Sequence, residues 1–110
     1  MSASIVRNQN IRWLVLVIIF AQRSAGATES GGWLTEDLLR RLLDAEGYPV
    51  TRDELCVVLD YLLDQHVGCL EKKASGDASD RKYKVRLTAR GIRAATREET
   101  IRGIGVASED

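Results

Sequence analysis

Three residues of this chain have side chains that often bind metal ions: Cys56, His66 and Cys69. Thiolate and imidazole groups are preferred ligands of zinc. Their spacing matches no recognised zinc pattern, and a single histidine after a helix is usually a surface residue. We therefore expect no metal site and no cofactor. Two cysteines are also too few for a disulfide framework, so we expect reduced thiols that pack as small apolar side chains.

A pair of carboxylates, Asp60 and Asp64, is spaced so that both lie on one face of a helix. Paired carboxylates can serve in general acid–base catalysis, but a solvated helix face explains the same spacing. The chain has one histidine, no G-x-S-x-G motif and no glycine-rich phosphate loop. The sequence therefore does not indicate an enzyme.

Basic residues concentrate between positions 72 and 86, where alternating apolar residues predict a β-hairpin. In its second strand Lys82, Lys84 and Arg86 share one face. Cations on such a face can contact DNA phosphates, which positions a protein without reading the base sequence. Together with a residue at the start of a predicted helix, the expected nucleic-acid-binding residues are Arg52, Lys72, Lys73, Arg81, Lys82, Lys84 and Arg86.

Charge is distributed unevenly, although the formal net charge is zero. Residues 28–65 contain nine acidic and three basic residues, whereas residues 66–97 contain nine basic and three acidic ones. An acidic segment beside a basic one says more about partners than the total charge does. Apolar content of 45% indicates a globular chain rather than a disordered one.

Two helices that form a helix-turn-helix pair are predicted in the acidic segment. Thr35 is the expected N-cap of a helix over 35–46, in which leucines recur at helical spacing. Thr51 and Glu54 fit a capping box that starts a second helix, which we expect to end near Gln65. The short connection around Gly47 is typical of helix-turn-helix motifs.

The basic segment is expected to form strands over 67–74 and 82–88, joined by a polar loop over 74–80. Thr88 is the expected N-cap of a last helix that ends between Thr96 and Glu99. We expect residues 1–98 to form one domain and residues 99–110 to be a flexible tail.

The apolar stretch Trp13–Ala21 allows several interpretations. It is too short for a membrane span, which needs about 20 apolar residues. A secretory signal peptide is an alternative, because arginines precede the stretch and Ala25-Gly26-Ala27 follows it. A strand is another, because the stretch contains β-branched residues. We favour a core helix in an uncleaved, cytoplasmic protein, because a helix-turn-helix pair needs a first helix to cover its leucines.

The expected order is helix, helix, helix, hairpin, helix. This is the order of a winged helix-turn-helix, a mainly α fold with a β-hairpin. The layout resembles the small winged-helix proteins of Mu-like phages and prophages. The resemblance rests on Gly32-Trp33-Leu34, on K-V-R-L-T-A-R-G-I-R-A-A over 84–95, and on the Thr-, Ile-, Gly- and Val-rich segment over 100–106.

Proteins of that family resemble arsenic-repressor-like regulators by fold, so the resemblance implies a transcription regulator in a bacterial host. Asp53-Glu54-Leu55-Cys56-Val57 also resembles the start of the metal-sensing motif of arsenic repressors. That motif continues with a second cysteine, where this chain has Val58. The thiolate pair that the motif needs is therefore missing.

Two functions are compatible with these patterns. The first is a DNA-binding winged helix, a phage regulator or DNA-associated accessory that contacts phosphates through its basic hairpin. The helix that would face the bases is mostly acidic, so we expect little sequence specificity. The alternative is a protein–protein interaction module on the same scaffold, such as a phage packaging or assembly accessory. Steep salt dependence of binding to duplex DNA would distinguish the first from the second.

A homodimer through the first helix is also expected. Consecutive apolar residues surround a helix at about 100° per residue, and one stripe suffices to cover the core of a monomer. The opposite stripe is the expected dimer interface and contains Trp13, Leu16, Val17 and Phe20. The alternative is that the tail, with Ile101, Ile104 and Val106, folds over this stripe in a monomer.

Overall fold

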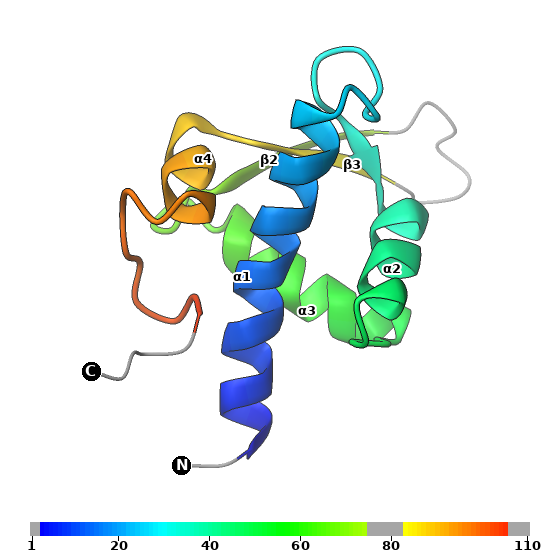
Figure 1. The fold of residues 1–110 in the computed structure, drawn as a ribbon. Coiled ribbons are helices and arrows are strands. Elements are labelled where there is room, and N and C mark those ends of the chain that lie inside the picture. Colours follow the sequence, from blue (N-terminus) through cyan, green and yellow to red (C-terminus); the bar gives the residue numbers. More distant parts are fainter. Residues whose placement is uncertain (1–2, 75–82, 106–110) are drawn as a thin grey trace.

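The computed structural model describes residues 3–74 and 83–105 (Figure 1). Within these residues the chain forms four helices and a three-stranded antiparallel sheet. Figure 1 shows α1 running through the middle of the molecule, with α2 and α4 on opposite sides of it. The elements are α1 (Ala3–Ser24), β1 (Leu34–Thr35), α2 (Glu36–Ala45), α3 (Arg52–Leu63), β2 (Leu70–Ala74), β3 (Tyr83–Leu87) and α4 (Ala89–Ala95).

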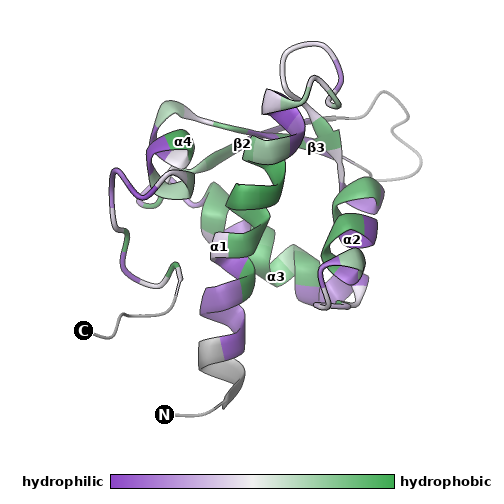
Figure 2. Ribbon diagram, viewed as in Figure 1, coloured by the Kyte–Doolittle hydropathy of each residue, from purple (hydrophilic) through white to green (hydrophobic). Residues whose placement is uncertain are grey.

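The stretch Trp13–Ala21 lies in the long helix α1, as we predicted. Ile11, Val15 and Ile19 recur every four residues and are at most 1% exposed. This spacing places them on one side of the helix, which faces the core. Figure 2 shows the apolar part of α1 against the other helices and the sheet, while the first coloured turn of the helix is hydrophilic. The helix is therefore the central wall of the core.

Threonine side chains begin the other three helices, as the sequence predicted. Thr35 and Thr88 each accept a hydrogen bond from the backbone N–H three residues on, at 3.2 and 3.1 Å. Thr51 forms a full capping box with Glu54. Its hydroxyl accepts from the Glu54 N–H at 3.0 Å, and the Glu54 carboxylate accepts from the Thr51 N–H at 2.9 Å. These bonds satisfy N–H groups that have no partner inside the helix.

We expect Thr51→Ala to lower the free energy of unfolding by about 1 kcal/mol, because it removes the hydroxyl half of the capping box. Urea unfolding followed by circular dichroism measures the change. Ser30→Ala, at an exposed turn position, is the control and should leave the midpoint unchanged. Equal midpoints for the two variants would show that the capping box adds nothing to stability.

The sheet has the strand order β1-β3-β2. The pairing of β2 with β3 confirms the predicted hairpin, while β1 was not predicted. A two-residue strand is too short to show alternation in the sequence. Leu34 lies opposite Val85 of the central strand β3, and both are 1% exposed. β1 therefore ties the start of α2 to the hairpin.

Residues 99–105, which we assigned to a flexible tail, pack against the helices instead. Ile101 is 8% exposed and belongs to the core. The Tyr61 hydroxyl of α3 donates a hydrogen bond to the backbone oxygen of Arg102 at 2.8 Å. The reason is the apolar side chain of Ile101, because the free energy gained by burying it outweighs the conformational entropy lost when the segment is ordered. The rest of the predicted tail lies outside the described residues.

The described residues thus form a mixed α/β fold with four helices and a small antiparallel sheet, which is compatible with a winged helix. None of the helices in residues 3–74 and 83–105 has the length and apolar character needed to cross a membrane.

Candidate nucleic-acid and protein interfaces

Arg52 begins α3, and half of its side chain is exposed. Its Nε atom lies 3.5 Å from the carboxylate of Glu36, which is 3% exposed at the start of α2. The Cys56 thiol donates a hydrogen bond to the same carboxylate, with 3.7 Å between sulfur and oxygen. A buried carboxylate requires such partners. Arg52 therefore neutralises Glu36 and is not free to contact a phosphate without leaving that charge uncompensated.

Four charged residues of the hairpin share one side of the sheet, which we call the outer sheet face. Residues directly opposite each other in an antiparallel pair project to the same side. The register places this side opposite the buried Val85 and Leu87, as the alternation in the sequence predicted. The outer sheet face contains Glu71, Lys73, Lys84 and Arg86.

Carboxylates neutralise two of these cations within the chain. Lys84 forms an ion pair with Glu29, which precedes β1. The Nε atom of Arg86 lies 2.9 Å from the carboxylate of Glu71 on the neighbouring strand. Cations held in such pairs attract phosphates less than isolated ones do. The outer sheet face is therefore less suited to DNA than its sequence indicated.

Trp33 lies under the outer sheet face and was not among the predicted site residues. It is 8% exposed, and the Lys73 ammonium and the Arg86 guanidinium each lie 4.6 Å from the centroid of its ring. Cations above an aromatic face are attracted by its quadrupole. These contacts hold Lys73 and Arg86 against the sheet.

Lys72 has a different position from the other predicted cations. Lys72 lies opposite Val85, so its side chain leaves the backbone on the inner side of the sheet. Its ammonium group is 5.1 Å from the centroid of the Tyr83 ring. Lys72 and Lys73 are both exposed, and no described residue forms an ion pair with either. Arg81 and Lys82, the remaining predicted residues, lie outside the described part of the chain.

A row of exposed side chains follows α3 on its solvent side, which we call the acidic row: Asp53, Val57, Asp60 and Asp64. The spacing of four and three residues places Asp53, Val57 and Asp60 on one helix face. Asp64 follows as the C-cap of α3, and its carboxylate accepts a hydrogen bond from the His66 N–H at 2.8 Å. Val57 is 59% exposed and is the one exposed large hydrophobic side chain among the described residues. The carboxylates of Asp53 and Asp60 have no hydrogen bond or ion pair in this part of the chain.

The residues of the predicted dimer interface do not form one surface. Leu16 is 0% exposed, so its assignment to that interface is wrong. It belongs to the core because α1 packs against α2, α3 and α4, which surround more than one side of it. Phe20 is half-buried against the core. Val17 lines a groove between α1 and α2.

Trp13 is covered by the segment that follows α4. The guanidinium of Arg97 lies 4.5 Å from the centroid of the Trp13 ring. The Gly105 N–H donates a hydrogen bond to the backbone oxygen of Gln9 on α1 at 2.8 Å. The cost of leaving Trp13 in water was a main reason to expect a dimer through α1. That reason no longer holds, because the chain's own C-terminal segment covers this residue.

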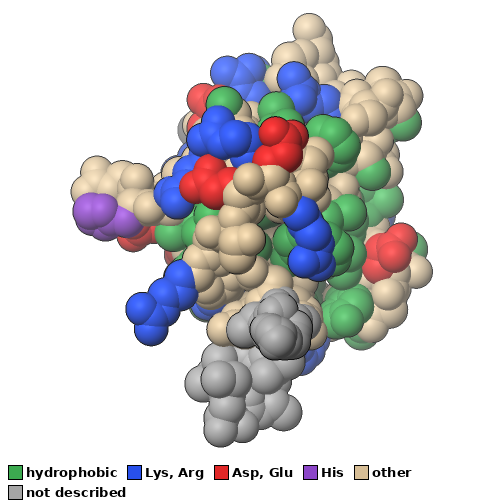
Figure 3. Space-filling model, turned by 60° about the vertical axis from the view of Figure 1, so that its left-hand side comes forward, with side chains coloured by type: hydrophobic (Ala, Val, Ile, Leu, Met, Phe, Trp, Pro, Cys, Tyr) green, Lys and Arg blue, Asp and Glu red, His purple; other side chains and the backbone are tan. Residues whose placement is uncertain are grey.

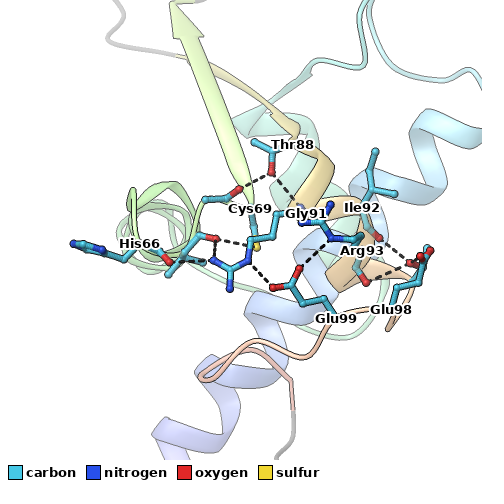
Figure 4. A network of polar contacts seen from close by, with 12 residues as sticks. His66, Cys69, Thr88, Gly91, Ile92, Arg93, Glu98 and Glu99 are labelled. Atoms are coloured by element: carbon cyan, nitrogen blue, oxygen red, sulfur yellow. Dashed lines mark hydrogen bonds and ion pairs between the residues drawn. The ribbon is translucent and has the colours of Figure 1, made fainter.

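Arg90 is the centre of a polar network between α4 and the segments around it. Figure 4 shows this network, with His66, Arg93 and Glu99 labelled. The Arg90 guanidinium donates to the backbone oxygens of His66 and Val67 and to the carboxylate of Glu99. Arg93 also bonds Glu99, at 3.1 Å. The hydrogen bonds from Arg90 and Arg93 lower the pKa of Glu99 below its usual range. In Figure 3, basic and acidic side chains are interspersed on the visible face and form no continuous basic surface.

We expect the Glu99 network to stabilise the fold at neutral pH and to be lost in acid. A carboxyl whose pKa is lowered by folding contributes stability above its unfolded pKa, and the contribution disappears as pH falls through the folded pKa. Glu99→Gln should therefore lower the melting temperature at about pH 7, and its difference from the parent chain should shrink as pH falls below about 4.3, the ordinary pKa of glutamate. Thermal unfolding across this pH range measures the difference. Glu46→Gln, an exposed position outside the network, is the control.

Cys56, His66 and Cys69 do not converge. Both cysteines are free thiols, and burial raises the pKa of Cys69 to about 11. Burial, with Glu36 nearby, also raises the pKa of Cys56. His66 is exposed and is visible as the single purple side chain at the edge of Figure 3. No group of three potential ligands arranged to hold a metal ion occurs within residues 3–74 and 83–105.

The chain was compared with protein-family models, with curated proteins and with solved structures, and none of them matches it.

Proposed function

We propose that this chain is a protein-interaction module on a winged-helix scaffold, and that the acidic row of α3 docks on a basic segment of a partner. The element order of helix, short strand, two helices, hairpin and helix supports the scaffold. A module from a Mu-like phage or prophage, serving as a packaging or assembly accessory, would fit this role.

The acidic row is the single observation that carries the proposal. Its carboxylates at 53 and 60 flank Val57 and have no partner among the described residues. An exposed apolar side chain between unpaired charges is complementary to a segment that presents one apolar side chain between cations. Apolar contact at the centre with charge at the rim is the usual composition of an interface.

The same row disfavours DNA reading by α3. In a helix-turn-helix protein the second helix of the pair enters the major groove, close to two phosphate backbones. Carboxylates at that position repel phosphates. Arg52, the one cation at the start of α3, is already 3.5 Å from the buried Glu36.

A peptide titration tests the proposal. The probe is a synthetic helical peptide with one leucine between lysines, and the readout is the change in backbone amide shifts. We expect changes along α3 around Val57, and their loss in the double variant Asp53→Asn and Asp60→Asn. Asp44→Asn, an exposed carboxylate on α2, is the matched control and should bind as the parent does. Equal binding by the double variant would contradict the proposal.

Duplex DNA is a second candidate partner, because Lys72 and Lys73 are exposed without a carboxylate partner among the described residues. If the hairpin binds DNA, a random duplex should bind with steep salt dependence. Replacing Lys72, Lys73, Lys82 and Lys84 by Ala should abolish that binding, while Asp60→Ala should not weaken it. Fluorescence anisotropy of a labelled duplex at low and moderate salt distinguishes the candidates: the interaction module predicts no salt-dependent binding.

A further inference from the structure

The segment over 100–105, which we call the C-terminal strap, bonds to α1 and α3 and packs on the core that they form. Ile101 is buried. Tyr61 of α3 donates to the backbone oxygen of Arg102 at 2.8 Å, and Arg12 of α1 donates to that of Gly103 at 3.0 Å. The Gly105 N–H donates a hydrogen bond to the backbone oxygen of Gln9 on α1. In Figure 1 the strap runs beside α1, after the chain has left α4.

The strap fits its groove closely. A β-carbon at Gly103 would lie 2.1 Å from the Tyr61 hydroxyl, so no other residue type fits there without displacing that ring. The backbone of Gly103 is also in the left-handed region, with φ of 88°. Such a groove selects this particular segment rather than apolar chains in general.

The connection between α4 and the strap contains a strained residue. Arg97 has φ of 63° and is the one residue other than glycine with positive φ in the described part of the chain. It follows the C-cap of α4, where glycine is usual because a side chain is disfavoured in this conformation. Its guanidinium stacks on Trp13 of α1. Extending α4 through Arg97 would remove the backbone strain and carry the strap away from its own groove. It would also separate Glu99 from Arg90 and Arg93 of the same chain.

We propose that two copies of this chain exchange their C-terminal straps, with Arg97 as the hinge. The occupant of the groove is the strap of a second copy. It is chemically identical, so the contacts of Ile101, Arg102, Gly103 and Gly105 are made again across the dimer, together with those of Glu99 to Arg90 and Arg93. The exchange relieves the strained turn at two hinges, and strained hinges favour exchange of an identical element between copies. This inference does not depend on the proposed function, because the acidic row is not part of the groove contacts.

A cross-linking experiment identifies the exchange directly. A β-carbon at Gly105 would lie 3.7 Å from the Trp13 β-carbon, within the range of a disulfide. One chain carries Trp13→Cys and a second carries Gly105→Cys, both with Cys56→Ser, and they are refolded together at high concentration. Exchanged straps yield an oxidised band at twice the chain mass of 12.2 kDa. Each variant refolded alone is the control and should stay at the chain mass.

Sedimentation of the unaltered chain and of two hinge variants completes the test without engineered cysteines. The parent should show a species of twice the chain mass that increases with concentration during refolding. Arg97→Gly relieves the strain in the closed form and should lower the dimer fraction about fivefold or more. Arg97→Ala loses the contact with Trp13 but keeps the strain, so it should retain the dimer. A single species at the chain mass at every concentration, or equal dimer fractions in the Gly and Ala variants, would overturn the proposal.

Discussion

Gly91→Ala is expected to lower the free energy of unfolding by about 3 kcal/mol. Gly91 is buried in the first turn of α4. This turn lies against Cys69, the last residue of the loop that joins α3 to β2. A β-carbon there would lie 2.1 Å from the backbone oxygen of Cys69. That oxygen accepts a hydrogen bond from the Thr88 N–H at 3.0 Å, so moving it disrupts the turn that starts α4. Urea unfolding monitored by tryptophan fluorescence measures the loss.

Gly26→Ala is the matched control for Gly91→Ala. Gly26 has φ of 72°, but a β-carbon there would have no neighbour within 4 Å. The substitution therefore costs the backbone strain alone, about 1 kcal/mol. If the two variants lose the same stability, the contact with Cys69 is not what requires glycine at position 91.

Leu16→Ala is expected to cost about 2–5 kcal/mol at any protein concentration. Leu16 is 0% exposed in the core of one chain, so shortening it leaves a cavity in the monomer. Val17→Ala, one residue along and half-buried beside the groove between α1 and α2, should cost much less. Unfolding curves at several concentrations test both statements.

The concentration dependence separates a core position from an interface position. Loss of a dimer contact makes the midpoint depend on chain concentration, because dissociation accompanies unfolding. A cavity in one chain produces no such dependence. If the Leu16→Ala midpoint shifts with concentration differently from the parent midpoint, Leu16 belongs to an interface between copies.

The helices were predictable because their signals are local. Thr35, Thr51 and Thr88 each act within three residues of their own position, and the sequence displays that spacing directly. The hairpin was predictable for the same reason, since apolar and charged residues alternate along β3 and a polar loop precedes it. β1 was not, because Leu34 pairs with Val85, far along the chain. A two-residue strand is defined by its hydrogen bonds to the partner strand, and nothing in its own two residues indicates that partner.

The candidate site was predictable as a set of charges but not as a set of contacts. Alternation correctly placed Lys84 and Arg86 on the side of the sheet away from the core. It contained no information that Glu29 and Glu71 would neutralise them, because those pairs arise from the register and from the loop before β1. The acidic row is the converse case. Its spacing was visible, but its lack of partners and the exposure of Val57 appear only in the structure.

The position of β2 has a consequence for solubility. Because β2 lies at the margin of the sheet, one side of its backbone is not paired with another strand of that sheet. Unpaired strand edges promote aggregation, and natural proteins protect them with charged side chains, lysine above all. Lys72 and Lys73 lie on this strand and are exposed. We therefore expect these lysines to disfavour the addition of a neighbouring molecule's strand to the sheet, whether or not they contact nucleic acid.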